Sequence, residues 1–392
     1  MNSGTGNQDG VRKTAAAVLP LLETIADEVV ARPLPRIQQT RDDGSVESLG
    51  FADALVAKKN ADAPRQIFFC IHLDTVYPPD CDFQHVEAFR QDGRDCLRGP
   101  GVADAKGGLA VLLGTLEAIH HASKSDSIWQ KVGWRVVLNP DEEIGTPAST
   151  PLLQEVGREC DFGLLYEPAL PDGTLIGARK GSGNFTIVVR GRSAHAGREI
   201  AAGRNAVAAL CDALLQIAKL QTADESVTVN LGRVAGGTAL NVVPDLAVGR
   251  FNVRIQHAAA MAGVREAIAQ IVGDINDRDG YSAHLEGDFS SPPKPVDAGL
   301  EVLQERLTDA GNSLAVPIRF RPSGGVCDGN KLAAVGVPNI DTMGPIGGKI
   351  HSDQEYVVCE SLVQRSQLGF QMLSDFARHP ERFPSRSDRI RK

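Results

Sequence analysis

Short apolar runs of strand length alternate with longer helical stretches through the first half of the chain. Strands are predicted over residues 67–71, 132–138 and 162–166, and a helix is predicted over residues 109–120. The strand segments are apolar at nearly every position, which favours a mostly parallel central sheet covered by helices on both faces. This part of the chain therefore predicts an α/β fold.

The pattern changes after Arg179 and then follows the order βαββαβ. This order is typical of a small ferredoxin-like open sheet with helices on one face. We therefore expect a second, smaller domain inserted into the first. Its predicted elements are a strand at 184–190, a helix at 202–220, strands at 226–234 and 247–255, a helix at 260–275 and a strand at 282–287.

A proline-rich segment at residues 291–295 marks the end of the inserted domain, because proline interrupts regular strands and helices. The α/β pattern then resumes. The predicted α/β domain comprises residues 1–179 and 293–392, and residues 180–292 form the inserted domain. The polar, basic tail after Arg378 is expected to be disordered.

Composition excludes several classes of partner. The formal net charge of −8 argues against nucleic acid or an anionic membrane, because both require clustered Lys and Arg. Acidic residues directly follow the apolar stretch 15–22, which favours an amphipathic helix over a signal peptide, and no apolar run is long enough to span a membrane. The seven cysteines are scattered singly and fit no disulfide framework, so we expect reduced thiols in the cytoplasm.

Four segments carry side chains that suit a metal site, and three of them follow predicted strands. In open α/β sheets, ligands gather at the carboxyl ends of the strands. His72 leaves the first of these strands, and Asp74 can accept its other ring N–H, which would fix the tautomer. A single histidine at a strand end is more often structural, so this segment alone is a weak signal.

Asp104 lies in the glycine-rich segment 99–108, at the start of the predicted helix. A carboxylate at a helix N-terminus is also an ordinary cap, because the helix dipole favours negative charge there. Phosphate binding is the alternative for a glycine-rich loop. Neither the GxGxxG nor the GxxxxGK[ST] pattern occurs in this segment, which argues against a nucleotide-dependent enzyme.

Further acids and a second histidine complete the set. Glu142 and Glu143 directly follow the strand 132–138, Glu167 ends the next strand, and His351 lies in a glycine-rich loop at 347–353. Consecutive acids usually form a solvated loop, but here they follow an apolar strand. Two histidines and several carboxylates at one edge suit Zn²⁺, or alternatively Mn²⁺ or Co²⁺. Two metals fit the number of candidate ligands better than one.

Because of these motifs, the chain resembles metallopeptidase family 20. This family includes bacterial glutamate carboxypeptidase, acetylornithine deacetylase, succinyl-diaminopimelate desuccinylase and aminoacylase. The similarity runs from about His72 to Tyr356 and is strongest to the glutamate carboxypeptidase group. The motifs that carry it are HLDTVY, GPGVADAKGG, NPDEEIG, YEP, GRSAHAG and HSDQEYV.

The resemblance implies a set of metal ligands. Asp104 would bridge two zinc ions, and the peptide bond that follows it would be cis. His72 and Glu167 would complete one metal, and Glu143 and His351 would complete the other.

The resemblance also implies the reaction. A metal-bridging water would attack an amide or peptide bond next to a free carboxylate and release a C-terminal amino acid. Glu142 would be the general base, and Asp74 would hold His72. The protein would thus be a zinc-dependent carboxypeptidase-like enzyme.

The inserted segment would be a lid and dimerisation domain of a homodimer. His195 would reach the neighbouring subunit's active site, and Asn241 and Arg254 would surround the substrate carboxylate and the reaction centre. Gly325, in the pair 324–325, would offer backbone groups to the substrate. The substrate would be a small peptide or an N-acyl amino acid.

One departure concerns glutamate specificity. Where the glutamate-specific enzymes carry a further arginine near the end of the lid, this chain has Ser290 and Ser291, and Lys294 is the nearest cation. An N-acyl-amino-acid deacylase or desuccinylase that uses the same site is therefore an alternative. A catalytically inactive metal-dependent binding protein is another, although such a protein would not need Glu142.

Overall fold

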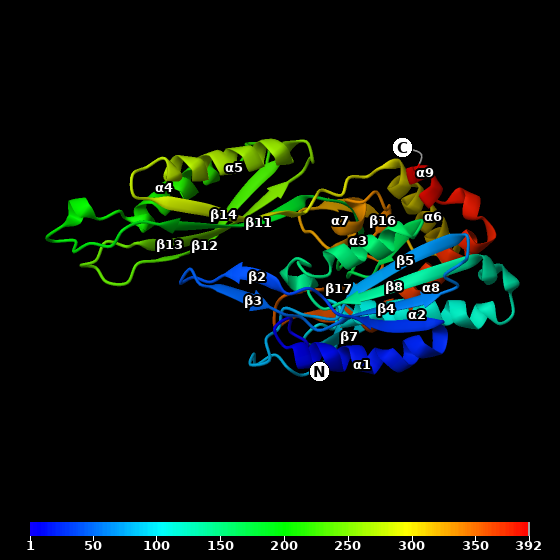
Figure 1. Ribbon diagram of the computed structural model, residues 1–392. Helices are drawn as coiled ribbons and strands as arrows, with labels where there is room; N and C mark the ends of the chain where they lie inside the picture. Colours follow the sequence, from blue (N-terminus) through cyan, green and yellow to red (C-terminus); the bar gives the residue numbers. More distant parts are fainter. Residues whose placement is uncertain (391–392) are drawn as a thin grey trace. The chain divides into compact units, whose positions relative to one another are not determined.

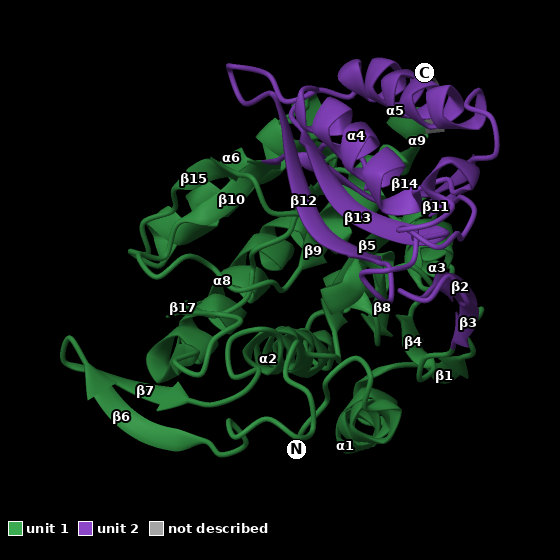
Figure 2. Cartoon of the chain, turned by 90° about the vertical axis from the view of Figure 1, so that its left-hand side faces the viewer, with its two compact units in different colours: residues 1–36, 50–178, 294–392 green, residues 37–49, 179–293 purple. Residues whose placement is uncertain are grey.

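The computed structural model describes residues 1–390, and the chain divides into two compact units (Figure 2). Each unit has its own apolar core. Unit 1 comprises residues 1–36, 50–178 and 294–392, and unit 2 comprises residues 37–49 and 179–293.

The core of unit 1 is a six-stranded sheet in the order β1-β4-β8-β5-β9-β16 (Figure 1). The neighbours from β8 to β16 run parallel, whereas β1 and β4 are added antiparallel at one edge. The central, mostly parallel sheet is the one that the apolar strand segments predict. The strands are β1 (Glu28–Arg32), β4 (Ala54–Lys59), β5 (Arg65–His72), β8 (Val132–Asn139), β9 (Phe162–Leu165) and β16 (Asn339–Ile340).

Helices cover both faces of this sheet (Figure 1). Because successive side chains of a strand point to opposite faces, β5 contributes to two apolar clusters. Ile67, Phe69 and Ile71 pack with residues of α1, α2, α6 and α8, whereas Phe68 and Cys70 pack with residues of α3 and α7. The helices are α1 (Gln8–Ile25), α2 (Lys106–Ser123), α3 (Thr150–Arg158), α6 (Ala298–Ser313), α7 (Asp328–Ala333) and α8 (Cys359–Arg378).

A second, four-stranded sheet of unit 1 joins two loops that matter for the site. Its order is β17-β18-β7-β6. Tyr356 of β18 pairs with Gly348 of β17 on one side and with Arg98 of β7 on the other. The loop that contains His351 therefore begins and ends on the same sheet from which the segment 99–105 departs. The strands are β6 (Glu87–Gln91), β7 (Arg94–Arg98), β17 (Gly347–Gly348) and β18 (Tyr356–Val358), and a separate pair is formed by β10 (Leu175–Arg179) and β15 (Phe320–Ser323).

Unit 2 has the βαββαβ order that the sequence predicts. Its antiparallel sheet runs β12-β13-β11-β14, and α4 and α5 cover one face of it (Figure 2). Phe185 of β11 and Phe251 of β13 are stacked within the apolar cluster under these helices. The elements are β11 (Gly181–Arg190), α4 (Ala206–Ala218), β12 (Val227–Gly236), β13 (Leu246–Ile255), α5 (Ala260–Asn276) and β14 (Ser282–Ser291).

A hairpin of β2 (Ile37–Thr40) and β3 (Val46–Leu49) belongs to unit 2, although the sequence analysis assigned it to the first domain. Asp42 in its turn forms ion pairs with Arg233 and Arg250, and Thr40 hydrogen-bonds Glu286. These partners are about 190 to 250 residues away in the chain. Local hydrophobic patterning carries no information about contacts of this kind, so the boundary prediction was wrong here.

The tail after Arg378 is ordered as far as it is described, contrary to the sequence-based expectation. A short helix, α9 (Arg386–Ile390), follows Phe383, which is buried and stacks on Phe162 with ring centroids 5.8 Å apart. The backbone N–H of Arg386 donates to Asp161 at 2.8 Å. One aromatic anchor and one buried carboxylate thus hold a segment of polar composition. Residues 391–392 lie outside the described part of the chain.

Within residues 1–390, no helix combines the length and the apolar character needed to cross a membrane.

The packing of the tail predicts a stability effect. Phe383→Ala should lower the free energy of unfolding by about 3–5 kcal/mol, because it removes a buried aromatic side chain. Glu381→Ala, two residues earlier and exposed, is the matched control and should change it by less than about 0.5 kcal/mol. Urea denaturation measures both, and equal small effects would indicate that the tail does not pack on the core.

Candidate metal centre

The parallel pairing of β5, β8 and β9 brings three segments with acidic or histidine side chains to one edge of the sheet. His72, the last residue of β5, pairs in register with Asn139, the last residue of β8. Glu142 and Glu143 follow Asn139 in a short 3-10 turn, and Glu167 lies two residues beyond the end of β9. This convergence is a consequence of parallel strands that end side by side.

His72 is fully buried and is held from both ring nitrogens. Its Nε2 lies 3.0 Å from Asp104 Oδ1, and its Nδ1 lies 3.3 Å from Asp74 Oδ1. The carboxylate of Asp74 also accepts the backbone N–H groups of Glu142 and Glu143, each at 3.2 Å. Asp74 therefore links the ring of His72 to the turn that carries the two glutamates.

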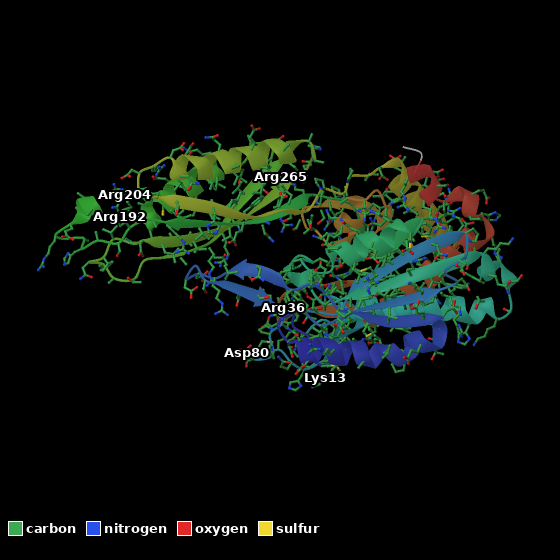
Figure 3. All side chains as sticks on the ribbon, viewed as in Figure 1. Lys13, Arg36, Asp80, Arg192, Arg204 and Arg265 are labelled. Atoms are coloured by element: carbon green, nitrogen blue, oxygen red, sulfur yellow. The ribbon has the colours of Figure 1, made fainter. Side chains whose placement is uncertain are left out.

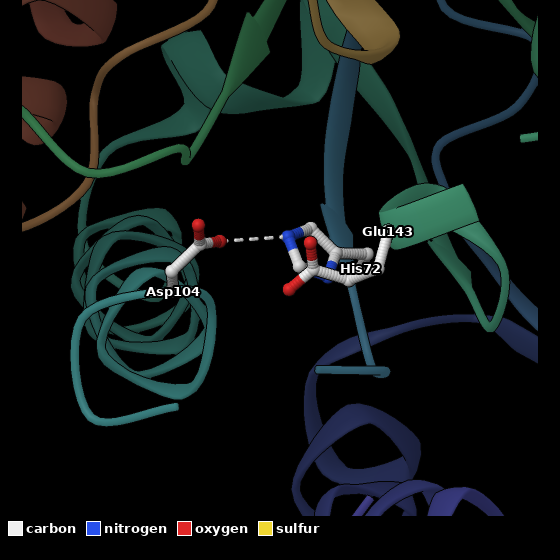
Figure 4. A group of neighbouring side chains, drawn as sticks. All are labelled: His72, Asp104 and Glu143. Atoms are coloured by element: carbon white, nitrogen blue, oxygen red, sulfur yellow. Dashed lines mark hydrogen bonds and ion pairs between the residues drawn. The ribbon is translucent and has the colours of Figure 1, made fainter. Parts of the chain in front are cut away.

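Asp104 lies between the two histidines of the site. Its Oδ1 faces His72, as Figure 4 shows, and its Oδ2 lies 3.3 Å from His351 Nε2. Glu167 Oε2 lies 3.9 Å from the ring of His72, and Glu143 Oε2 lies 3.3 Å from the ring of His351. Each oxygen of Asp104 thus faces one histidine, with one glutamate beside it. The Asp104–Ala105 peptide bond is cis, as expected.

The glycines that follow Asp104 permit a close approach of helix α2 to the end of β9. A Cβ atom on Gly108 would lie 2.0 Å from the backbone oxygen of Tyr166, the residue before Glu167. Only glycine can occupy this position without displacing the backbone that leads to Glu167. The glycine density of the segment 99–108 therefore reflects packing of the protein against itself rather than a phosphate loop.

Several negative charges are crowded together at this edge of the sheet. Burial and the neighbouring Glu167 raise the pKa of Glu142 well above its usual range, and burial also raises the pKa of Glu143, although His351 hydrogen-bonds it. Hydrogen bonds to Asp104 and Glu143 raise the pKa of His351 to about 10. Such shifts indicate a site that requires positive charge among its carboxylates.

The donor set fits divalent metal. Ligand atoms of His72, Asp104 and Glu143 all lie within 4.8 Å of one another. Among the described residues, Glu143 Oε1 is buried without a hydrogen-bond partner, which is costly for a carboxylate oxygen unless a cation satisfies it. Imidazole nitrogens and carboxylate oxygens are ligands that Zn²⁺ and related metals take in proteins.

A buried polar network beneath the Glu142 turn escaped the sequence analysis. Asp328, at the start of α7, accepts hydrogen bonds from Asn139 Nδ2 at 2.8 Å and from the hydroxyl of Thr146. Lys331 donates from Nζ to the backbone oxygen of Gly145 at 3.0 Å. These contacts fix both ends of the turn that carries Glu142. The sequence DGN after the glycine pair 324–325 is the only local signal, and it does not reveal these distant partners.

Thr5 is a second residue that the sequence gave no reason to select. Its hydroxyl donates to Asp74 Oδ2 at 2.7 Å, and its backbone N–H donates to the backbone oxygen of Thr75. Lys106 Nζ donates to the hydroxyl of Ser3 at 2.9 Å. The first residues of the chain therefore form part of the support for Asp74, and through Asp74 for His72.

The candidates predicted on the inserted domain, His195, Asn241 and Arg254, lie on unit 2. His195 is exposed, accepts the N–H of Gly197 on its Nδ1 at 3.1 Å, and forms a β-bridge with Val242, the neighbour of Asn241. The segment that carries His195 follows Arg192, which forms a β-bridge with Arg204; Figure 3 labels both. His195 and Asn241 therefore belong to adjoining loops of unit 2.

Arg254 lies on β13 of unit 2 and is partly buried. Its Nε donates to Asn252 Oδ1 at 2.9 Å, and Asn252 in turn donates to the hydroxyl of Ser182 at 2.8 Å. Burial lowers the pKa of Arg254, as expected for a cation that is partly removed from water. The side chain is thus held by a neighbouring amide.

Gly325 lies in a loop of unit 1, whereas Lys294 is buried in an ion pair. Gly325, on unit 1, lies in the loop between β15 and α7, and its N–H donates to Ser323 Oγ at 3.0 Å. Lys294, which the sequence analysis noted as the cation nearest to Ser290 and Ser291, is buried and donates to Asp341 at 2.6 Å. Lys294 is therefore paired with an internal carboxylate. It does not replace the arginine that the glutamate-specific enzymes carry near the end of the lid.

The position of Asp104 between the histidines predicts its effect on metal binding. Zinc added at about 100 times its dissociation constant should stabilise the chelator-treated protein by about 2.7 kcal/mol. Asp104→Asn, which has the same shape but no charge, should abolish this stabilisation. The control Asp353→Asn changes an exposed acid two residues after His351 and should retain it. Thermal unfolding with and without zinc measures the effect, and full stabilisation of Asp104→Asn would exclude Asp104 as a ligand.

Comparison with known proteins finds relatives over most of the chain. Residues 177–280 match the model of the peptidase dimerisation domain of the M20 family. Carboxypeptidase G2 of Pseudomonas sp. (strain RS-16) is 26% identical over 390 residues, which cover 96% of this chain and 86% of the relative. Succinyl-diaminopimelate desuccinylase of Ectopseudomonas mendocina is 26% identical over 334 residues, which cover 81% of this chain and 84% of the relative.

Solved structures share the fold over nearly the whole chain. The M20 family metallo-carboxypeptidase Sso-CP2 from Sulfolobus solfataricus superposes with a TM-score of 0.73 at 13% identity, covering 96% of both chains. The YXEP protein of Bacillus subtilis, a dinuclear metal-binding peptidase of the M20 family, superposes with a TM-score of 0.60 at 17% identity, covering 96% of this chain and 94% of the other. Together with the dimerisation-domain match and the cluster of histidines and acids, these similarities support a relationship to the M20 metallopeptidase family and indicate a metal-dependent hydrolase.

Proposed function

We propose that the protein hydrolyses an amide or peptide bond next to a free carboxylate and releases a C-terminal amino acid. The observation that carries this proposal is the position of Asp104 between His72 and His351, with the half-buried residues Glu142 and Glu143 beside them. The similarity to carboxypeptidase G2 over 96% of the chain supports the carboxypeptidase-like reaction.

Two zinc ions are the proposed cofactors, with Mn²⁺ or Co²⁺ as alternatives. Asp104 would bridge them, His72 and Glu167 would hold one, and Glu143 and His351 would hold the other. Two such ions would lower the pKa of a water molecule and polarise the substrate carbonyl. The separate approach of each histidine to its own oxygen of Asp104 supports this division.

Glu142 is proposed as the general base. It begins the turn Glu142–Ile144, whose backbone is fixed by Asp74 at one end and by Lys331, through Gly145, at the other. Its partial burial raises its pKa, which favours proton uptake from the attacking water. Glu142 would then deliver a proton to the leaving amine.

Unit 2 is proposed as the lid and dimerisation domain, and unit 1 as the catalytic domain. His195 would donate to the developing oxyanion in the neighbouring subunit of a homodimer, where Asn241 would also contribute. Arg254 would bind the substrate carboxylate, since its planar guanidinium can form two parallel hydrogen bonds. Gly325 would offer its backbone to the substrate. The match of residues 177–280 to a dimerisation domain supports the homodimer.

A desuccinylase or N-acyl-amino-acid deacylase is the second candidate. It is favoured by the similarity to succinyl-diaminopimelate desuccinylase over 81% of the chain. Lys294 is bound to Asp341, so it is not the cation that would select glutamate. Both candidates would use the same metals and the same general base.

For the compartment we propose the cytoplasm. No disulfide joins any of the seven cysteines, all of which lie within the described residues, and this agrees with a reducing environment.

A substrate panel separates the two candidates. Metal-loaded protein would be tested on benzoyl-, acetyl-, succinyl- and dipeptidyl-amino acids, before and after chelation. Chelator-sensitive release of the amino acid from dipeptidyl or benzoyl substrates supports the carboxypeptidase-like activity. Exclusive cleavage of succinyl substrates supports the desuccinylase, and no hydrolysis of any of them by metal-loaded protein would refute both.

Replacing Glu142, the proposed general base, should reduce turnover without affecting metal binding. Glu142→Gln is expected to retain the fold and bound metal but to reduce kcat by about 10²–10⁴-fold, because only the proton acceptor is lost. Metal content by elemental analysis and turnover would be measured on the same sample. Normal turnover in fully metallated Glu142→Gln protein would contradict the assignment.

The role of Arg254 is testable with paired substrates. Arg254→Ala should reduce kcat/KM about tenfold or more for a substrate with a free carboxylate, because a charged hydrogen bond is lost. It should leave the corresponding carboxamide nearly unaffected. Arg265→Ala, on α5 of the same unit (Figure 3), is the control and should affect neither substrate. Equal losses on both substrates would argue against binding of the carboxylate by Arg254.

A further inference from the structure

Glu355 is a fully buried carboxylate four residues after His351, and it has no part in the proposed chemistry. Its Oε1 accepts the backbone N–H groups of Ala103 and Asp104, both at 2.9 Å. Its Oε2 accepts the N–H of Gly101 at 3.2 Å and lies 2.6 Å from the hydroxyl of Tyr77. Four donors therefore converge on one side chain, which satisfies its buried charge.

Three of these donors belong to the irregular loop that presents Asp104. The loop leaves β7 and enters α2 without forming a strand or a helix, and Gly101 adopts a left-handed conformation with φ 75°. Buried backbone N–H groups in such a loop have no regular partners, so they need another acceptor. Glu355 supplies it, including the acceptor for the N–H of Asp104 itself.

The backbone of the same residue also connects to the loop of His351. The backbone oxygen of Glu355 accepts the N–H of Gly99 at 3.1 Å, and its own N–H donates to Ser352 at 3.1 Å. The hydroxyl of Tyr77 lies 2.9 Å from the backbone oxygen of Ser352 as well as 2.6 Å from Glu355. The segments that carry His72, Asp104 and His351 thus meet at Glu355 and Tyr77.

We propose that Glu355 is a positioning residue that holds Asp104 and His351 in their metal-binding arrangement before any metal is bound. Asp104 can face two histidines at once only if its loop is fixed relative to the loop of His351. Glu355 joins both loops, because its side chain accepts three N–H groups of the first and its backbone N–H donates to Ser352 of the second. The inference rests on the proposed function, in which Asp104 and His351 are metal ligands. Groups that orient metal ligands in this way commonly contribute 10–100-fold to metal affinity.

A buried carboxylate elsewhere in unit 1 provides the matched control. Asp161 is also fully buried, and it accepts the backbone N–H groups of Gln66 at 2.6 Å and Arg386 at 2.8 Å. Gln66 is the second residue of β5, the strand that ends at His72, so it lies about 20 Å from His72 along the strand. Loss of either charge should destabilise the fold, but only loss of Glu355 should affect the metal.

The test compares Glu355→Gln, Tyr77→Phe and Asp161→Asn in the full-length, chelator-treated protein. In Glu355→Gln, an amide NH₂ group would face donors in either orientation. Zinc affinity, measured by competition with a chromogenic chelator, should fall about 10–100-fold in Glu355→Gln and less in Tyr77→Phe, which keeps the three backbone hydrogen bonds. It should stay within about twofold of wild type in Asp161→Asn.

Hydrogen exchange of the metal-free proteins gives a second readout. The amides of Ala103 and Asp104 should exchange at least about tenfold faster in Glu355→Gln than in wild type, and should be unchanged in Asp161→Asn. If wild-type affinity persists in Glu355→Gln, or if Asp161→Asn weakens zinc equally, the positioning role is overturned. If Glu355→Gln does not fold, Tyr77→Phe decides, because unchanged affinity there also overturns the role. Absence of zinc binding by the wild type would instead refute the proposed function on which this inference rests.

Discussion

The crowding of carboxylates around Asp104 is the constraint on which the rest of the site depends. Asp104, Glu143 and Glu167 lie around the buried ring of His72 and the exposed ring of His351, and burial favours the neutral form of Glu143. Negative charges brought so close together would destabilise the fold unless cations compensate them. In the metal-free protein His351 provides part of that compensation, since its pKa is raised to about 10. Divalent metal would replace it and leave the imidazole free to act as a ligand.

The fold holds the acidic side chains in place by fixing the backbone of the segments that carry them. Parallel strands that end near one another bring His72, the Glu142 turn and Glu167 to one edge. Two buried carboxylates then hold the connecting segments: Asp74 binds the turn of Glu142, and Glu355 binds the loop of Asp104. A site assembled from loops in this way can be rigid, because each loop has an internal acceptor for its N–H groups.

The sequence predicts those features that depend on local pattern. The apolar segments 67–71 and 132–138 indicate buried strands, and the βαββαβ order of unit 2 follows from periodicity alone. Motif spacing also selects the residues that the structure brings together around Asp104. Features that depend on distant partners were missed or misassigned. The hairpin 37–49 is held by Arg233 and Arg250, and the tail is anchored by Phe383. The supporting contacts of Asp328 and Glu355 were also missed. A single polar residue gives no indication of which backbone it will bind after folding.

The most direct measurement of the central claim is anomalous diffraction at the zinc edge from crystals of the zinc-loaded protein. The account predicts two peaks on either side of the Asp104 carboxylate, one bound by His72 and Glu167 and the other bound by Glu143 and His351. A single peak, peaks away from Asp104, or no bound zinc at this edge of the sheet would contradict it.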